Sequence, residues 1–414
     1  MTFEKFVGPV MKCQICSSAP LQTILALGHH PLPSSYLTEE QMHQGEVSYP
    51  LNFVRCDACG LLQLDHIVDP KLVFPPEYPY QTGLTNMLVR NFQSLAETVI
   101  PMFGLNEKSL VIDIGSNDGT LLKAFMERGT RVLGIEPTNV SKLANERGIE
   151  TIKEYISVDV ARKIVESHGK ADVVTAANVF AHINNLTEVI ESIKELLTDD
   201  GVFISESQYL LDILEKLEFD TIYHEHLRFY SLKPLQRLFE LTGMSIVDAE
   251  HIPAAGGSIR VYAKKGQHAS STRVAELIAA EEAAGINDTS ALKRFAERAI
   301  KTKRDLLALL LECKTKGRIA SVGAPVRANT LLNFAHVDAS LLDYCGEKGG
   351  SPKIGMFTPG MHIPVVDEKE FFENQPEFAF VNSWHIGDEL IKKLKDLGYK
   401  GRFIVPLPEP RLVE

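Results

Sequence analysis

Two short cysteine pairs constrain the fold of this 414-residue chain more than any other feature. Cys13 and Cys16 form one Cys-x-x-Cys loop, and Cys56 and Cys59 form a second, which Gly60 follows. Each loop can present two thiolates to one ion, and two loops complete the tetrahedral ligand set that zinc prefers. A single loop could be a redox motif, and buried free thiols are the simpler alternative. We favour a structural zinc site, because four protein ligands leave no open coordination position.

The composition is that of an ordinary globular protein, with 44% hydrophobic and 23% charged residues. A net charge of −11 provides no basic field for a nucleic acid or an anionic membrane, so we expect neither partner. The N-terminus lacks the apolar core of a signal peptide, and no stretch is apolar over the roughly 18 residues of a membrane helix. We therefore expect a cytoplasmic protein with reduced cysteines. The isolated Cys313 and Cys345 should be small buried residues.

From about residue 85, apolar runs of strand length alternate with helical segments. Such alternation predicts a doubly wound α/β sheet. The predicted strands cover 110–114, 131–135, 149–152, 171–176, 202–206, 244–249 and 258–263, and the predicted helices 87–100, 121–128, 158–168 and 235–241. Ser231 is the expected N-cap of the last of these helices.

The C-terminal third begins with a helix-rich, charged stretch over 270–315 that can bridge two domains. A second α/β unit follows, with strands expected near 339–344, 378–382 and 402–405. Its Gly323-Ala-Pro turn has too few glycines for a dinucleotide. This turn therefore predicts a packing role or a contact to substrate phosphates.

The turn after the first strand of the middle sheet, Gly115-Ser-Asn-Asp-Gly119, lacks the G-x-G-x-x-G spacing of a dinucleotide site. Glu136 ends the next strand about 20 residues later, where a carboxylate can accept hydrogen bonds from a ribose diol. With Asp113, expected to order the turn from beneath, the pattern resembles the S-adenosylmethionine site of Rossmann-like methyltransferases. An NAD site and a turn without a ligand are the alternatives. The candidate donor contacts are Asp113, Gly115, Ser116, Asn117, Glu136, Pro137 and Asn178.

Residues 221–232 concentrate Tyr223, His224, Glu225 and His226 in one short segment. In a helix the two histidines would diverge, and in a strand they would share one face with the glutamate opposite, so the segment alone makes a weak metal site. A polar packing cluster at a domain junction is one alternative. The functional alternative is a loop that points at the end of the sheet where the methyl donor would bind.

Several motifs together resemble one family, the zinc-containing sugar C-methyltransferases that act on nucleotide-linked 4-keto deoxyhexoses. The resemblance covers almost the whole chain, in order. It is carried by the cysteine pairs, by the segments 111–120, 178–182 and 223–231, and by Gly256-Gly-Ser-Ile-Arg260, 323–333, 358–364 and 406–408.

The resemblance implies three parts: a zinc-binding domain at 1–80, a Rossmann-like donor domain at 81–268, and an α/β domain at 269–414 that helps to hold the sugar nucleotide. It also implies methylation at C3, next to the C4 ketone, of a dTDP- or GDP-linked 4-keto-6-deoxysugar. His226 falls on the family's catalytic base, with Tyr223, Glu225 and His182 beside it. One tyrosine of Tyr78-Pro-Tyr80 is expected to face the sugar.

The candidate substrate contacts are Arg260, Arg327, Asn329 and His362. Two segments near these contacts depart from the family pattern: Pro253-Ala-Ala before the glycine pair, and Val326-Arg-Ala after Gly323-Ala-Pro. The rival functions are an O- or N-methyltransferase on a sugar nucleotide and a zinc-ribbon RNA methyltransferase. The net acidic charge disfavours the second rival. A monomer and a homodimer both remain open.

Overall fold

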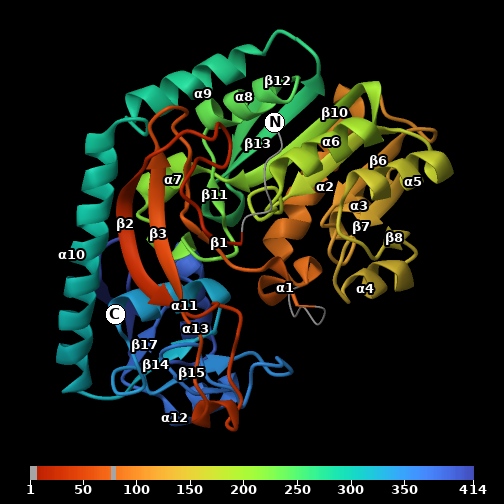
Figure 1. The fold of residues 1–414 in the computed structure, drawn as a ribbon. Helices are drawn as coiled ribbons and strands as arrows, with labels where there is room; N and C mark the ends of the chain where they lie inside the picture. Colours follow the sequence, from red (N-terminus) through yellow and green to blue (C-terminus); the bar gives the residue numbers. More distant parts are fainter. Residues whose placement is uncertain (1–6, 76–80) are drawn as a thin grey trace.

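The computed structural model describes residues 7–75 and 81–414, so Tyr78 and Tyr80 lie outside the described residues. Figure 1 shows an N-terminal part beside two sheet-and-helix parts, with the long helix α10 along one side. Within the described ranges, none of the helices is both long and apolar enough to cross a bilayer. The arrangement confirms the predicted fold class: a four-cysteine N-terminal part, a Rossmann-like middle part and an α/β C-terminal part.

The N-terminal part is built around a four-stranded antiparallel sheet in the order β11-β4-β3-β2. Its outer strand β11 comes from the middle of the chain and pairs with β4, with Arg228 opposite Gln63. The segment that contains His226 therefore runs directly into the sheet of the N-terminal part. The elements are β1 (Gly8–Pro9), β2 (Leu21–His30), η1 (Gln41–His43), β3 (Tyr49–Cys56), β4 (Leu62–Leu64), β5 (His66–Ile67), α1 (Pro70–Val73) and β11 (Arg228–Phe229).

The middle part is a seven-stranded sheet in the order β12-β13-β10-β9-β6-β7-β8. The pairs from β10 to β8 are parallel, and β13 and β12 close the other edge in antiparallel pairing. Strand order reverses between β6 and β9, and ligands of open α/β sheets bind outside the carboxyl ends of strands at such a point.

Three of the elements predicted for the middle part, β6, β7 and α5, have the bounds that the sequence predicted. The elements of the middle part are η2 (Thr82–Leu84), α2 (Asn86–Met102), β6 (Leu110–Ile114), α3 (Thr120–Met126), β7 (Arg131–Ile135), α4 (Ser141–Glu146), β8 (Thr151–Ile152), α5 (Val158–His168), β9 (Ala171–Ala177), α6 (Leu186–Leu196), β10 (Leu197–Gln208), α7 (Leu210–Glu215), η3 (Phe219–Thr221), α8 (Leu232–Leu241), β12 (Met244–Ile252), η4 (Ala254–Gly256) and β13 (Ser258–Lys265).

The N-terminus of α8 is satisfied differently from the sequence prediction. Ser231 occupies the N-cap position, but its side chain makes no capping hydrogen bond. The backbone N–H of Leu232 instead donates to Oε1 of Glu281 on α9 (Thr272–Ala283), at 2.8 Å. A carboxylate from another helix thus replaces the local cap, because it is buried directly against the helix end.

The C-terminal part is a six-stranded sheet in the order β16-β15-β14-β17-β18-β19, parallel except for the last pair. The strand expected near 339–344 lies later, at Tyr344–Glu347, because Asp338 and Ser340 form a hydrogen-bonded turn before it. The elements are α9, α10 (Thr289–Lys314), β14 (Ile319–Val322), α11 (Val326–Ala335), β15 (Tyr344–Glu347), β16 (Val365–Asp367), α12 (Glu368–Asn374), β17 (Phe378–Phe380), η5 (Trp384–Ile386), α13 (Gly387–Asp396), β18 (Arg402–Val405) and β19 (Arg411–Val413).

A single hydrophobic cluster joins the three parts. Phe53 of β3 lies edge-on to Phe229 of β11, with ring centroids 4.9 Å apart, and 6.1 Å from Phe295 of α10. Cys313 and Cys345 are buried, as predicted. Because the parts share their core, residues that are far apart in sequence are held in fixed relation at the junction.

Candidate active site

The four cysteines of the two Cys-x-x-Cys loops meet in the N-terminal part. Their Sγ atoms all lie within 4.8 Å of one another, with Cys13 and Cys59 at 3.5 Å and Cys16 and Cys56 also at 3.5 Å. Tetrahedral zinc with Zn–S bonds of about 2.3 Å requires sulfur atoms roughly 3.8 Å apart, so this set fits the ion. It is the only such cluster among the residues that the structure describes. With four protein ligands it is a structural site.

The glycine turn of the middle part follows β6 at the point where strand order reverses. Gly115, Asn117 and Gly119 all have positive φ angles, of 71°, 50° and 77°. A Cβ at Gly115 would lie 2.6 Å from Cγ2 of Val179, so the turn packs tightly against the segment that follows β9. The turn is also tied to η2, because Thr82 N donates to Oδ1 of Asn117 at 2.8 Å. These contacts fix the backbone of the turn, which must lie close to a bound methyl donor.

Glu136 orders this turn from the end of β7. Its Oε2 accepts the backbone N–H of Asn117 at 3.0 Å, and its Oε1 accepts that of Thr138 at 2.9 Å. A carboxylate has about four acceptor positions, so two remain for the hydroxyls of a ribose. Ser116 adds a buried Oγ that has no hydrogen-bond partner among the described residues. These unused polar positions fit S-adenosylmethionine, whose ribose and amino-acid moiety can occupy them.

Asp113 was expected to order the glycine turn from beneath. Its Oδ1 accepts the hydroxyl of Thr175 on the adjacent strand β9, at 2.6 Å, and it is Glu136 that accepts a turn amide. Burial raises the pKa of Asp113 to about 7.

Asn178, with φ of 56°, follows β9, and its N–H donates to the carbonyl of Glu206 at 2.7 Å. Pro137 follows Glu136 at the end of β7. The structure thus gathers the residues predicted to contact the methyl donor around the carboxyl ends of β6, β7 and β9.

The segment with Tyr223 and His226 is a loop fixed on two sides. Leu227 N donates to the carbonyl of Ala181 at 3.1 Å, and Leu64 N donates to the carbonyl of Leu227 at 3.0 Å. The first bond ties the loop to the segment after β9, and the second ties it to the N-terminal sheet. His182 and His226 therefore come together although they lie 44 positions apart in the sequence.

His226 lies at the centre of an aromatic cluster. Its ring centroid is 4.1 Å from that of Tyr223 and 4.9 Å from that of His182. Phe74, just after α1, stacks on His182 at 5.7 Å. Nδ1 of His226 lies 2.7 Å from the carbonyl of Thr221. A carbonyl can only accept, so Nδ1 carries the proton and Nε2 keeps its lone pair.

Both histidines of this cluster are neutral at physiological pH. The pKa of His226 is lowered to about 4, chiefly by burial and also by the nearby charge of Arg327, while the bond to Thr221 opposes the shift. Burial and the neighbouring His226 hold the pKa of His182 well below its usual range. The cluster thus offers an uncharged imidazole with one defined free nitrogen.

The neighbouring His224 of the same loop points elsewhere. His224 is buried against the N-terminal part, and its Nε2 donates to the carbonyl of Pro50 at 3.2 Å. Burial lowers the pKa of His224 to about 4. Glu225 is buried as well. Because the two histidines diverge, the loop does not gather ligands for an ion.

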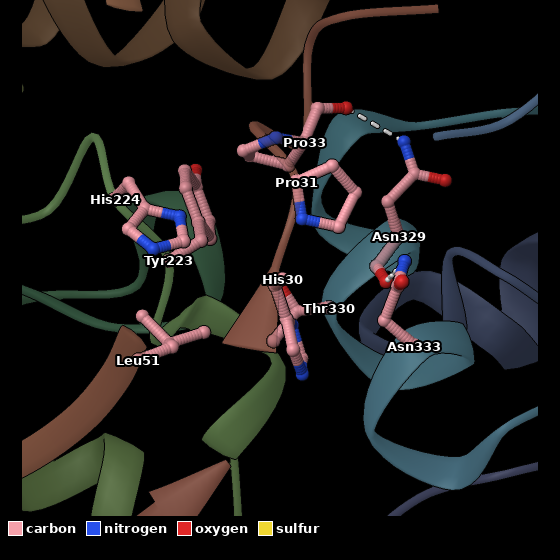
Figure 2. Close-up of a pocket in the computed structure, with 9 residues that line it drawn as sticks. All are labelled: His30, Pro31, Pro33, Leu51, Tyr223, His224, Asn329, Thr330 and Asn333. Atoms are coloured by element: carbon pink, nitrogen blue, oxygen red, sulfur yellow. Dashed lines mark hydrogen bonds between the residues drawn. The ribbon is translucent and has the colours of Figure 1, made fainter. Parts of the chain in front are cut away.

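A narrow crevice lies beside Tyr223 where all three parts of the chain meet (Figure 2). Figure 2 shows Tyr223 and His224 on one side and the side chains of α11 on the other, with the end of β2 between them. The crevice is too narrow for a water molecule. Its lining residues are His30, Pro31, Pro33, Leu51, Tyr223, His224, Asn329, Thr330 and Asn333.

The four substrate-contact candidates lie in different places. Asn329 borders the crevice, and its Nδ2 donates to the carbonyl of Pro33 at 2.7 Å. Arg327 lies in the first turn of α11 and is close enough to His226 to affect its pKa. His362 lies in a shallow depression, with Nε2 2.9 Å from Oε2 of Glu46.

Arg260 lies within the middle sheet rather than beside the crevice. Its guanidinium bonds Glu206 and Glu250 on the two flanking strands, each at 3.0 Å, and also Oδ1 of Asn91. Its three nitrogens are therefore all engaged with protein acceptors. The structure brings Asn329 and Arg327 to the junction, and it leaves His362 and Arg260 apart from it.

Sequence reasoning missed the carbonyl of Thr221 and the carboxylate of Asp220. A backbone carbonyl leaves no trace in a residue pattern. Asp220 is fully buried and bonds residues of the C-terminal part. Its position just before the Tyr-His-Glu-His segment was the only available signal.

Comparison with known proteins identifies the three parts. Residues 13–74 match a family model described as a putative zinc binding domain, 87–249 a methyltransferase domain, and 253–408 a C-methyltransferase C-terminal domain. The chain is 32% identical to C-methyltransferase NovU of Streptomyces niveus over 415 aligned positions, covering 99% of this chain and 98% of that protein. The chain belongs to the C-methyltransferase family. As a member, it is an S-adenosylmethionine-dependent C-methyltransferase with a zinc-binding N-terminal part.

Other relatives match a smaller share of this C-methyltransferase. Ubiquinone biosynthesis O-methyltransferase of Colwellia psychrerythraea is 30% identical over 157 residues, which is 34% of this chain and 63% of that protein. A solved S-adenosylmethionine-dependent methyltransferase of Clostridium acetobutylicum is 12% identical, with a TM-score of 0.35, and the match covers 43% of this chain and 92% of that one.

Proposed function

We propose that this C-methyltransferase methylates C3 of a dTDP- or GDP-linked 4-keto-6-deoxysugar, with His226 as the general base. The observation that carries the proposal is the bond from Nδ1 of His226 to the Thr221 carbonyl, which leaves Nε2 as the one basic nitrogen of a neutral ring. The sugar class rests on the family resemblance of the motifs described above.

The chemistry requires removal of a proton from a carbon. The hydrogen on C3 is acidified by the neighbouring C4 ketone, and Nε2 takes it as the enolate forms. A well-placed base of this kind contributes roughly 10²–10⁴-fold to the rate. The enolate carbon then attacks the sulfonium methyl in line, a step that depends on positioning. S-adenosylmethionine supplies the methyl group, and the zinc site takes no part in this step.

The residues around His226 have complementary roles in this proposal. The carbonyl of Thr221 accepts from Nδ1 and so stabilises the imidazolium that forms when the proton is taken. Tyr223, whose ring contacts that of His226, can donate its hydroxyl proton to the developing enolate oxygen. Loss of one such donor costs about 10²-fold. We place His182 and Glu225 beside the acceptor, and Asn329 at the sugar-nucleotide side.

Exchange of the C3 hydrogen tests the base directly. In deuterated water, the enzyme with the 4-ketosugar and S-adenosylhomocysteine should introduce deuterium at C3, and His226→Asn should slow this exchange at least ~10²-fold. His336→Asn is the matched control, because His336 is exposed and its positive φ of 55° suits asparagine. An O- or N-methyltransferase would transfer methyl without any C3 exchange, and that result would exclude the proposal.

The pH dependence of exchange gives a second test. A histidine with the ordinary pKa of about 6.5 would be mostly protonated at pH 6. Burial lowers the pKa of His226 to about 4, so the ring stays neutral there. The exchange rate should therefore change less than twofold between pH 8 and pH 6. A rate that falls with a midpoint near pH 6.5, the ordinary pKa of histidine, would contradict the lowered pKa of His226 but not its role as the base.

A further inference from the structure

The turn η3, which precedes the His226 loop, is clamped by the C-terminal part of the chain. Asp220 of this turn accepts two hydrogen bonds from Arg327 of α11, from Nε at 2.7 Å and from Nη2 at 2.8 Å. It also accepts the indole N–H of Trp384 in η5, at 2.8 Å. Asp220 is fully buried, so its charge depends on these three donors.

The clamp is supported by packing on both sides of the ion pair. The Arg327 guanidinium lies 5.1 Å above the ring of Trp384 and 3.3 Å from a carboxylate oxygen of Glu218. Phe219, also in η3, lies edge-on to Phe334 of α11 at 5.3 Å. The turn is therefore packed against α11 and η5 of the C-terminal part.

The residue after Asp220 sets the tautomer of His226. The carbonyl of Thr221 accepts from Nδ1 of His226, while the Thr221 N–H and hydroxyl both bond the carbonyl of Glu218, at 3.0 and 2.7 Å. One peptide unit thus connects the ion pair to the imidazole. If the turn shifted by the length of a hydrogen bond, no other acceptor among the described residues would hold the proton on Nδ1.

We propose that Asp220 and Arg327 are positioning residues, which act through the Thr221 carbonyl to keep Nε2 of His226 as the free nitrogen. The inference deepens the proposed function and rests on it, since His226 is the base only under that proposal. It also gives Arg327 a role other than direct substrate contact. The pair makes the C-terminal part necessary for the orientation of the base.

Two conservative substitutions test the pair. Asp220→Asn keeps the shape but loses the charge, and Arg327→Lys keeps the charge but loses the planar two-bond geometry. We expect each to lower kcat and the rate of C3 exchange about 10²-fold while leaving the affinity for S-adenosylhomocysteine within twofold. Since the two residues act as one unit, the double variant should be no slower than the slower single variant. Additive losses would overturn the proposal, as would single variants with normal exchange.

The tautomer itself gives a readout that does not depend on activity. In protein labelled with ¹⁵N-histidine, and with His226→Asn used to assign its signals, the wild type should show His226 protonated on Nδ1. Asp220→Asn and Arg327→Lys should show a mixture of the two tautomers. An unchanged Nδ1–H signal in both variants would refute the positioning role.

A control variant shows that the effects are specific to this pair, and the two readouts distinguish failure of this proposal from failure of the proposed function. Arg273→Lys alters a similar arginine–aspartate pair, with Asp248 on the outer strand β12, and should leave exchange and the tautomer unchanged. If Asp220→Asn fails to fold, Arg327→Lys still decides the outcome. If the wild type shows no C3 exchange although the tautomer shifts in the variants, the proposed function fails and the positioning of His226 stands.

Discussion

The middle and C-terminal sheets use the same local design at one strand end, with different results. In each, a buried parallel strand ends in a glycine with positive φ: Gly115 at 71° and Gly323 at 80°. The glycine N–H donates to the end of the neighbouring strand, at 2.8 Å for Gly115 and at 2.6 Å for Gly323. A glutamate at the end of that strand accepts a turn amide, Glu136 from Asn117 and Glu347 from Ala324.

The difference lies in what the rest of the chain places on each turn. The carbonyl of Ala324 accepts from the hydroxyl of Tyr36, in the N-terminal part, and from Nζ of Lys353, both at 2.7 Å. Lys353 also lies 5.1 Å above the Tyr36 ring. At the middle turn, the hydroxyl of Ser116 is buried without a partner in the described residues. The turn alone does not make a ligand site; a ligand also needs a polar group that other segments leave unsatisfied, such as Oγ of Ser116 among the described residues.

Removal of zinc should have the largest effect on the difference between the two glycine turns. Structural zinc contributes on the order of 10 kcal/mol to folding, so Cys56→Ser or chelation should unfold the N-terminal part and release Tyr36 from the second turn. Hydrogen exchange should then rise at residues 21–64 and at 324–330, and stay low at 115–120. Cys313→Ser, at a buried cysteine outside the cluster, is the control. Unchanged protection of 21–64 in the zinc-free protein would contradict a structural zinc.

Replacement of either glutamate by alanine gives the next test, and we expect the larger loss of affinity at Glu136. Glu136→Ala removes the acceptor that we propose for the ribose hydroxyls, and charge-assisted hydrogen bonds of this kind contribute about 1.5–3 kcal/mol each. The affinity for S-adenosylhomocysteine, measured by calorimetry, should fall about 100-fold. Glu347→Ala should change it less than threefold, because its turn is covered by Tyr36 and Lys353. Equal losses in both variants would mean that the two turns do not differ as described.

Much of this organisation can be predicted from the sequence, because it depends on local patterns. Strands β6 and β7 were predicted to the residue from short apolar runs, and the four cysteines from their spacing. Long-range partners could not be predicted. The cap of α8 comes from Glu281, 49 residues away, and the covering of the Gly323 turn comes from Tyr36, 288 residues away.

Arg260 shows the same limit inside one sheet. Its motif resembled a substrate contact, but strand register places it directly opposite Glu206 on β10 and Glu250 on β12. Register between strands depends on the whole sheet and is not written in one segment. Local sequence therefore predicts the elements and the glycine turns, and only the assembled fold decides which polar groups remain available to a ligand.

Alanine in place of each glycine should sharpen the comparison through stability. Both positions carry the strain of positive φ, about 1 kcal/mol. Only Gly115→Ala adds a clash, because its Cβ would meet Val179 at 2.6 Å, whereas at Gly323 the nearest atom is 3.7 Å away. In denaturant unfolding, Gly115→Ala should cost roughly 2–4 kcal/mol and Gly323→Ala about 1 kcal/mol.

The clash can be separated from the strain. Val179→Ala removes the side chain that a Cβ at Gly115 would meet, so the double variant should recover the part of the loss that comes from overpacking. If the double variant loses at least as much free energy of unfolding as the two single variants together, backbone strain alone makes Gly115 necessary.

The smallest effect should come from the hydroxyl that covers the second turn. Tyr36→Phe removes the bond to the Ala324 carbonyl and the bond from Nδ2 of Asn329, at 3.2 Å, but the carbonyl keeps Lys353 as a donor. The loss should be about 1 kcal/mol in urea unfolding, since the net value of one buried hydrogen bond is of that order. Tyr155→Phe, at a tyrosine that is 49% exposed, should cost less than half of that. If Tyr36→Phe instead increased the affinity for a nucleotide sugar, the second turn would be a ligand site that Tyr36 competes for, and the contrast between the two sheets would be one of degree.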